Sequence, residues 1–266
     1  MIIYRTPLRI GLFGGSTDLQ DFINYKGYGQ VINFACNLYT TCILSQDRFG
    51  LNSYENKNVI MYKKREEESN ISDIKNKLIR TCMQDLKQKK TIVLLSDITS
   101  KSSGLSSSSS IISSIFASLI DLENNSMSKM QFIKEVIKLE KEIVPLCGFQ
   151  DSYGCILGGL NNIKVTKNNK HTVEKISCCF LKEELNMYLL KVPIVSDSND
   201  VLPTVCDSKN FNIREEILDI MLSAQTAMVN ENMDYFLELF KASWDLKKKT
   251  SSKIMCNELE EIEKEI

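Results

Sequence analysis

The segment Ser100–Ser110 is a run of small polar residues whose composition could give it a chemical role. It reads SKSSGLSSSSS and lies between a compact apolar segment at 91–95 and a strongly periodic apolar segment that begins at Ile111. A strand, a small-residue loop and a helix start together form an anion site, because the first N–H groups of a helix lack intrahelical partners and the helix dipole favours negative charge there. No GxxxxGK[ST] string is present, which excludes a Walker loop. The spacing favours phosphate binding, with a serine linker or a plain capped helix as alternatives.

The glycines gather beside two further polar segments. The chain has only 11 glycines, and apart from Gly50 they form three groups, the last of which ends at Gly159. One group begins in TPLRIGLFGGSTDL, one is Gly104 of the serine run, and one lies in GFQDSYGCILGGLNN. Glycines in a glycine-poor chain mark turns or close backbone approaches. An ordinary turn explains any one of them, whereas three groups that each adjoin polar residues indicate sites.

The overall composition excludes several function classes. With 33 Lys and Arg against 34 Asp and Glu, the formal net charge is −1, so neither a nucleic-acid-binding surface nor an acidic tail is indicated. The 266 residues are 43% hydrophobic and 25% charged, as in globular proteins, and no stretch approaches the roughly 18 apolar residues of a membrane span. Arg5 and Arg9 interrupt the apolar start, which argues against a secretory signal.

Cysteine and histidine usage narrows the chemistry further. Nine cysteines without a CxxC pair fit reduced thiols better than disulfides or a zinc site. His171 is the one histidine of the sequence, which disfavours Ser-His-Asp hydrolases and histidine-based metal sites. We therefore expect a cytoplasmic protein with no nucleic-acid or membrane partner, whose chemistry does not use histidine.

Alternating blocks of strand and helix patterns must position the polar segments. Runs rich in Val, Ile, Tyr and Thr predict strands before the serine run, and apolar residues at helical spacing predict the helix after it. The order of the blocks favours an α+β protein over a strict βαβ repeat. We expect strands at 2–13 (short strands around a turn at Pro7), 31–46, 58–62, 91–95 and within 160–194, and helices at 71–88, 111–122, 129–144 and 213–265.

Four segments, in this order, resemble the GHMP kinases (galactokinase, homoserine kinase, mevalonate kinase and relatives), and among them the heptose-phosphate kinase branch. SSGLSSSSS resembles the family's GLGSSS phosphate loop, and TPLRIGLFGGSTDL resembles its opening APLRISFAGGGTDL. GFQDSYGCILGGLNNIKV is similar to the branch's GxQDxYAAxxGGxNxI, and SWDLKKKTSSKI to its SWxLKKxLS segment. The resemblance implies an α+β fold with a ribosomal-S5-like N-terminal domain over 1–170 and an incomplete ferredoxin-like C-terminal domain over 171–266.

The resemblance also implies roles for single residues in phosphoryl transfer from ATP. Asp151 matches the catalytic aspartate that faces the acceptor hydroxyl, and Arg9 matches the basic residue that neutralises charge. Ser108 and Glu140 match the residues that hold Mg²⁺. The other matches form a substrate-binding turn (Gly15, Ser16, Thr17 and Asp18) and an ATP-binding loop (Gly104, Leu105, Ser106, Ser107, Ser108 and Ser109).

Each of these residues also has an ordinary structural interpretation. Asp151 could be a turn or cap residue, Glu140 a solvated helix charge, and Arg9 a strand-surface residue. The three lysines at 247–249 are typical of a solvated helix face, although they could also meet a substrate phosphate, and Trp244 is typical of a core. The ordered occurrence of all four segments favours the functional interpretation.

Two departures from the family pattern affect these expectations. Ser106 stands where the family usually has glycine, and Ser100 and Ser102 replace its usual proline and glycine; we expect Ser106 to fit if its φ stays negative. The family's C-terminal GAGGGG motif has no counterpart before Ile266. We therefore expect a chain truncated by that motif, weakly active alone, which self-associates or needs a partner that supplies the segment.

The expected function is that of an ATP- and Mg²⁺-dependent sugar kinase. The resemblance implies transfer of the γ-phosphate to O1 of D-glycero-D-manno-heptose 7-phosphate, in the synthesis of nucleotide-activated heptose and surface polysaccharide. A fucose-type sugar kinase is one alternative. A catalytically impaired relative that only binds sugar or nucleotide is the other.

Overall fold

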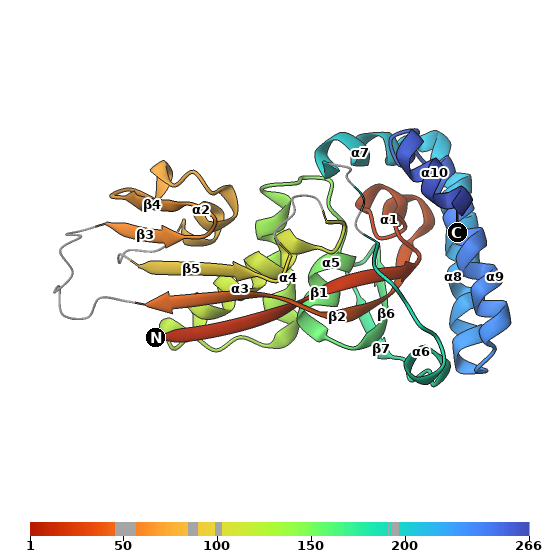
Figure 1. Cartoon of the computed structure of the whole chain (residues 1–266), viewed down its shortest axis with the longest axis horizontal. Coiled ribbons are helices and arrows are strands. Elements are labelled where there is room, and N and C mark those ends of the chain that lie inside the picture. The colour runs from red at the N-terminus through yellow and green to blue at the C-terminus, as the bar shows by residue number, and fades with distance from the viewer. Residues whose placement is uncertain (46–56, 85–89, 99–102, 191, 193–196, 266) are drawn as a thin grey trace. The chain divides into compact units, whose positions relative to one another are not determined.

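The computed structural model describes residues 1–45, 57–84, 90–98, 103–190, 192 and 197–265, with strands and helices mixed along the chain (Figure 1). This content confirms the predicted α+β class. The strands are β1 (Ile2–Phe13), β2 (Tyr28–Ser45), β3 (Asn58–Met61), β4 (Arg65–Glu68), β5 (Thr91–Ser96), β6 (Leu160–Thr166) and β7 (His171–Lys175). The α-helices are α1 (Gln20–Lys26), α2 (Lys77–Met83), α3 (Ser107–Leu122), α4 (Lys129–Lys141), α5 (Gln150–Leu157), α6 (Phe180–Glu183), α7 (Ser198–Val205), α8 (Phe211–Val229), α9 (Met233–Lys249) and α10 (Asn257–Glu265).

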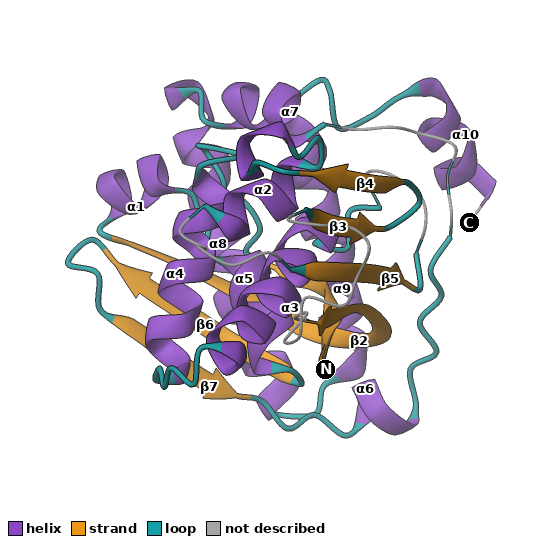
Figure 2. Ribbon diagram, turned by 90° about the vertical axis from the view of Figure 1, so that its left-hand side faces the viewer, coloured by secondary structure: helices purple, strands orange, loops and turns teal. Residues whose placement is uncertain are grey.

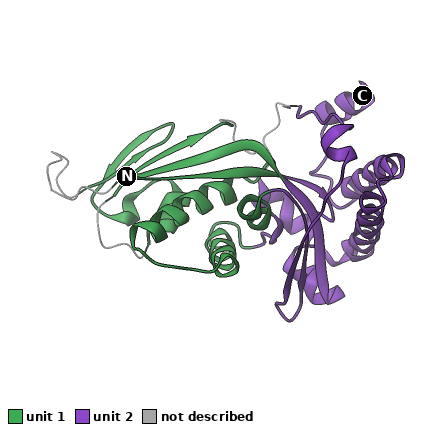
Figure 3. Ribbon diagram, turned by 90° about the horizontal axis from the view of Figure 1, so that it is seen from below, with its two compact units in different colours: residues 1–9, 35–145, 151–158 green, residues 10–34, 146–150, 159–266 purple. Residues whose placement is uncertain are grey.

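The chain forms two compact units that interleave along the sequence (Figure 3). Unit 1 comprises residues 1–9, 35–145 and 151–158, and unit 2 comprises residues 10–34, 146–150 and 159–266. These units are clusters in space, so they do not test the sequential division at residue 170, which stays a prediction.

Unit 1 combines a set of neighbouring strands with helices α2, α3 and α4 (Figure 2). The second half of β2 pairs antiparallel with β5, β5 pairs parallel with β3, and β3 pairs antiparallel with β4. Ile112, Ile115 and Leu119 of α3 are buried, which confirms the apolar face predicted from their spacing. This buried face fixes the helix that follows the serine run.

Unit 2 is built on the first half of β2, which pairs antiparallel with β6, and on β7 at the far side of β6. Helices α8 and α9 pack against each other (Figure 1). The core of this unit is rich in aromatic residues, and the rings of Phe13 and Phe236 meet edge to face with their centroids 5.4 Å apart. This core supports the glycine-containing segment that follows β1.

Three local expectations need correction. Pro7 does not divide the first segment: β1 is one strand, and among the described strands it pairs only with β2, so the missing N–H of proline is tolerated. The segment 71–84 holds a 3₁₀ turn at Ile71–Asp73 and α2, whereas 85–89 lie outside the described residues. Residues 187–190, expected in a strand, form no regular element, and the neighbouring 191 and 193–196 lie outside the described residues.

Candidate active site

The serine run leads directly into α3. Residues 99–102, at its beginning, lie outside the described residues. The first bond of the helical ladder runs from the Ser110 N–H to the Ser106 carbonyl at 3.0 Å, so the N–H groups of 107–109 precede that ladder. Within the described chain, the side chain of Ser106 does not cap them. These backbone groups are available to donate to an anion, and the loop fits a phosphate ligand.

Ser106 adopts the left-handed backbone conformation, so the condition of a negative φ, under which serine was expected to fit, is not met. Its φ is 61° and its ψ is 39°, and Gly104 also has a positive φ of 70°. A serine in this region costs about 1 kcal/mol, whereas glycine adopts it without a side-chain clash. The Ser106 hydroxyl is also buried, with no hydrogen-bond partner among the described residues. The loop therefore keeps a backbone geometry that suits glycine.

Other contacts hold the loop in place. The Leu105 carbonyl accepts a 3.2 Å hydrogen bond from the backbone N–H of Arg9, which ties the loop to β1. The hydroxyls of Ser103 and Ser107 lie 2.9 Å apart, and Ser108 is exposed at the helix start. The predicted magnesium ligand is therefore a solvent-accessible hydroxyl at the helix N-terminus.

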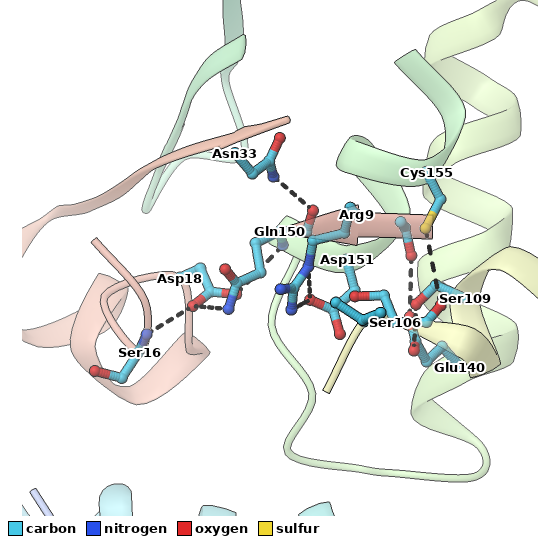
Figure 4. Close-up of polar contacts among 12 residues, drawn as sticks. Arg9, Ser16, Asp18, Asn33, Ser106, Ser109, Glu140, Gln150, Asp151 and Cys155 are labelled. Atoms are coloured by element: carbon cyan, nitrogen blue, oxygen red, sulfur yellow. Dashed lines mark hydrogen bonds and ion pairs between the residues drawn. The ribbon is translucent and has the colours of Figure 1, made fainter. Parts of the chain in front are cut away.

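Strand β1 and helix α5 bring Arg9 and Asp151 together (Figure 4). Arg9 Nε donates to Asp151 Oδ1 at 2.9 Å, and Nη2 pairs with the same oxygen. The Arg9 side chain is 12% exposed and that of Asp151 is 32% exposed, so the carboxylate can meet a ligand from solvent. Asp151 lies in the first turn of α5, where the helix dipole stabilises a negative charge.

Glu140 of α4 is a buried carboxyl beside this pair. It is therefore not a solvated charge on the helix surface. Its Oε1 accepts from Ser109 Oγ at 2.5 Å and its Oε2 from Ser152 Oγ at 3.0 Å. Burial, followed by the charge of Asp151, raises the pKa of Glu140 to about 7, although both serine bonds and Arg9 oppose the shift. Ser109, predicted only as a backbone contact, is thus the loop serine that contacts Glu140.

The carboxylate and hydroxyl oxygens of unit 1 suit a divalent cation that binds together with phosphate groups. Glu140 and Asp151 are close enough for the charge of one to raise the pKa of the other. No group of three or more His, Cys, Asp or Glu that could hold a metal occurs in the described part of the chain. Mg²⁺ does not need one, because in kinases it keeps waters and is held by one or two carboxylates plus phosphate oxygens. The residues present fit Mg²⁺.

The glycine turn of unit 2, residues 14–18, is held by backbone contacts to β2. The buried Thr17 hydroxyl donates to the carbonyls of Gly14 and Gln30, both at 2.8 Å. Gly14 has a φ of 78°, and a Cβ there would lie 2.2 Å from the Gln30 carbonyl oxygen. Glycine is therefore required at position 14, the Thr17 hydroxyl stabilises the turn, and the contact of Thr17 with a substrate stays a prediction.

Asp18 is almost fully buried, with 2% of its surface exposed. Its Oδ1 accepts from the Ser16 N–H at 3.1 Å, and its Oδ2 accepts from the Gln150 N–H at 3.3 Å (Figure 4). A Cβ at Gly148 would lie 1.8 Å from Asp18 Oδ2, so glycine leaves the space that this carboxylate occupies. Asp18 fastens the glycine turn to the start of α5, and its contact with a sugar hydroxyl stays a prediction.

Arg214 of α8 is a residue of this region that the sequence did not reveal. It is fully buried, donates to the Ser16 carbonyl at 2.8 and 3.2 Å, and pairs with Asp21 at 2.5 and 2.8 Å. In the sequence it precedes two glutamates and looks like part of a helical charge ladder. The pairing joins residues far apart in the chain, so no local pattern marks it.

Asn33 of β2 is a second residue that sequence patterns missed. It is fully buried, and its Nδ2 donates to the Gln150 carbonyl at 2.9 Å (Figure 4). Gln150 is therefore held on both sides of its backbone, at its N–H by Asp18 and at its carbonyl by Asn33. The residue that precedes Asp151 in the chain has a fixed conformation.

Comparisons with known proteins relate this chain to kinases. Residues 74–159 match the family model described as GHMP kinases N terminal domain. Over 277 residues the chain is 24% identical to the D-glycero-alpha-D-manno-heptose 7-phosphate kinase of Campylobacter jejuni, an alignment that covers 98% of this chain and 81% of that protein.

Solved structures show the same fold. A D-glycero-D-manno-heptose 1-phosphate kinase from Bacteroides thetaiotaomicron superposes with a TM-score of 0.73 at 18% identity, over 94% of this chain and 80% of that one. The Methanococcus jannaschii mevalonate kinase superposes with a TM-score of 0.68 at 21% identity, over 98% of this chain and 82% of that one. No described helix is long and apolar enough to cross a membrane. Residues 74–159 therefore form a GHMP kinase N-terminal domain, and the chain is a kinase, a phosphotransferase with an alcohol group as acceptor.

Proposed function

We propose that this kinase transfers the γ-phosphate of ATP to O1 of D-glycero-D-manno-heptose 7-phosphate, in a route to nucleotide-activated heptose. The observation that carries the proposal is the Arg9–Asp151 pair in the same unit as the serine loop and Glu140. The similarity to a heptose 7-phosphate kinase over nearly the whole chain supports the choice of sugar.

Phosphoryl transfer depends on positioning and on charge neutralisation more than on covalent chemistry. The N–H groups that precede the α3 ladder bind the phosphate chain of ATP. Arg9 fixes the orientation of the Asp151 carboxylate and adds a positive charge near the transferring group. The Asp151 oxygens orient the acceptor hydroxyl and take its proton as its oxygen bonds to the γ-phosphorus, while the bond from that phosphorus to the β–γ bridging oxygen breaks and ADP leaves.

Glu140 and Ser108 are the residues that would hold Mg²⁺, which when bound neutralises charge on the phosphate oxygens. Ser109 and Ser152 keep the Glu140 carboxylate in position from both sides. Calorimetry with ATP and MgCl₂ tests this assignment through Ser108→Ala, which should weaken Mg²⁺-dependent nucleotide binding, with the exposed Ser126→Ala as control. Equal binding by both variants would remove Ser108 from the metal site.

The activity itself is tested by a coupled ADP-release assay with heptose 7-phosphate, unphosphorylated heptose and fucose as acceptors. Heptose 7-phosphate should give the highest kcat/KM. Asp151→Asn should lower kcat by about 10²-fold or more, because the neutral amide cannot take the proton. The exposed Asp121→Asn is a matched control with unchanged turnover expected. Preference for another acceptor, or near-normal turnover by Asp151→Asn, would overturn the proposal.

A further inference from the structure

Asn33 of β2 is a fully buried residue whose side-chain amide is satisfied at one end only. Its Nδ2 donates to the Gln150 carbonyl at 2.9 Å, whereas its Oδ1 is buried and has no hydrogen-bond partner among the described residues (Figure 4). A buried polar atom without a partner costs stability, and an apolar side chain would avoid that cost. Stability therefore does not explain an asparagine at this position.

The orientation of the Asn33 amide is fixed by the group that it faces. If the amide were turned over, Oδ1 would meet the Gln150 carbonyl oxygen, and two acceptors at this distance repel each other. The backbone of Asn33 is held as well, because the residue lies inside β2, opposite Asn161 of β6 in the antiparallel ladder. A paired strand therefore presents the donor to the carbonyl.

The carbonyl that receives this bond belongs to the peptide group that joins Gln150 to Asp151. These two residues are the first and second of α5. Asp18 accepts from the Gln150 N–H at 3.3 Å, so Gln150 is held at both ends of its backbone. Because a peptide group is planar, its orientation, together with the φ of Asp151, sets the direction in which the Asp151 side chain leaves the backbone.

Arg9 restrains the other end of the Asp151 side chain. Both of its contacts are to Asp151 Oδ1, so they fix the carboxylate but not the backbone that carries it. In enzymes a misplacement of about 1 Å can lower the rate about 10²-fold. A carboxylate that must face an acceptor hydroxyl therefore needs its backbone to be held as well.

We propose that Asn33 is a positioning residue for phosphoryl transfer, and that its amide holds the Gln150–Asp151 peptide group so that the carboxylate faces the acceptor hydroxyl. The inference rests on the proposed role of Asp151. Because Asn33 is fully buried, it acts through the backbone of Gln150 and not through contact with a substrate. The unpartnered Oδ1 is a stability cost that accompanies this role.

Steady-state kinetics with Asn33→Leu and the matched Asn58→Leu tests the proposal. Leucine keeps the branching at Cγ but has no donor, so Asn33→Leu should lower kcat by about 10- to 100-fold. Its KM values for ATP and for the sugar should stay within about twofold of the parent values, because the binding groups are unchanged. Asn58 is also buried and donates to a backbone carbonyl, that of Glu68 at 3.4 Å, and its replacement should leave kcat unchanged.

Thermal unfolding separates mispositioning from damage to the fold. Asn33→Leu removes one hydrogen bond but also the unpartnered oxygen, so its melting temperature should fall by less than about 5 °C. Asn58→Leu removes two hydrogen bonds, to Glu68 and from Lys90, and should lower the melting temperature at least as much. If Asn33→Leu does not fold, Asn33→Ser replaces it, because the shorter side chain cannot reach the carbonyl. An unchanged kcat in a folded Asn33 variant, or an equal fall in kcat for Asn58→Leu, would overturn the inference.

A double-mutant cycle with Asp151→Asn separates the inference from the proposed function. In the Asp151→Asn background, Asn33→Leu should change kcat by less than about twofold, since the carboxylate that Asn33 positions is already absent. Effects that multiply would show that Asn33 does not act through Asp151, and the inference would fail while the proposed function holds. Near-normal turnover by Asp151→Asn alone would reject the proposed role of Asp151 itself. The cycle uses whichever sugar is the best acceptor, so a different sugar does not change its outcome.

Discussion

The glycine turn of unit 2 and the serine loop of unit 1, both proposed as ligand sites, differ in how their charged groups are satisfied. In the glycine turn, the polar groups of Thr17, Asp18 and Arg214 are directed to protein partners. In unit 1, Glu140 is a buried carboxyl with a raised pKa. Each segment also holds one left-handed serine whose buried hydroxyl has no partner within the described chain, Ser16 in the turn and Ser106 in the loop.

The difference indicates where each region gets its stability. The charged groups of the glycine turn, Asp18 and Arg214, are matched by protein partners, so its shape is held without a ligand. The serine loop and its carboxyls include groups that oppose folding, the left-handed Ser106 and the buried Glu140 carboxyl. A bound cation and phosphate groups would relieve this cost. Strained backbone and buried ionisable groups are common at functional sites, where the surrounding structure holds them in place. Three variants test this comparison.

The largest effect is expected from Arg214→Met. Removing the buried guanidinium leaves Asp21 without its ion-pair partner and the Ser16 carbonyl without its donor, so the free energy of unfolding should fall by about 3–5 kcal/mol. Urea denaturation measures this loss. Lys26→Met is the matched control, because it removes a surface pair between the same two helices, Lys26–Glu215 at 2.6 Å, and the loss of this exposed pair should cost far less stability.

A similar small loss for both variants would show that the glycine turn does not depend on its buried pair. If Arg214→Met does not fold, Arg214→Lys serves instead. It keeps the charge but loses the planar fork, and should lose less stability than Arg214→Met while still raising the KM for the sugar.

Glu140→Gln should act in opposite directions on stability and on metal binding. The pKa of Glu140 is about 7 in the folded chain against an ordinary value of 4.5, so its contribution to stability is present below pH 4.5 and is lost as the pH rises to about 7. The neutral glutamine avoids that loss. Without Mg²⁺, we expect Glu140→Gln to be more stable than the parent chain at pH 8, by on the order of 2 kcal/mol, and about equally stable at pH 4.5.

Thermal unfolding across this pH range, and nucleotide calorimetry with MgCl₂, measure the two effects. Glu135→Gln is the control, because Glu135 lies on the surface of the same helix, 3.5 Å from Lys138. It should change neither property. A Glu140→Gln chain that is destabilised at pH 8, or that keeps full Mg²⁺-dependent nucleotide affinity, would contradict the description of unit 1 as a site completed by its cation.

The smallest effect concerns the strain at Ser106. Ser106→Gly removes a left-handed serine, which gains about 1 kcal/mol, but adds chain entropy to the unfolded state, so the net change in unfolding free energy should be within about 1 kcal/mol of zero. Ser107→Gly, one residue later at the first position of α3, relieves no left-handed strain and should lose up to about 1 kcal/mol. Equal losses for both variants would show that the conformation of Ser106 is not strained.

Much of the fold and part of the site could be predicted from local patterns. The buried face of α3 follows from apolar residues at helical spacing, and the entry of the serine run into that helix follows from small residues before it. The resemblance of four segments predicted the family and the kinase class, which the comparisons confirm. The roles of single site residues stay predictions, although Arg9, Asp151, Ser109 and Glu140 do lie together in unit 1.

What the sequence by itself determined is local: helical periodicity, turn residues and short motifs, each readable within a few residues. What only the tertiary structure decided is which polar groups are buried and with whom. Arg214 and Asp21 are 193 positions apart, and Glu140 looks like any helix-surface glutamate until Ser109 and Ser152 are brought to it. The physical reason is that desolvation and ion pairing depend on the three-dimensional surroundings of a charge, which its neighbours in the chain do not specify.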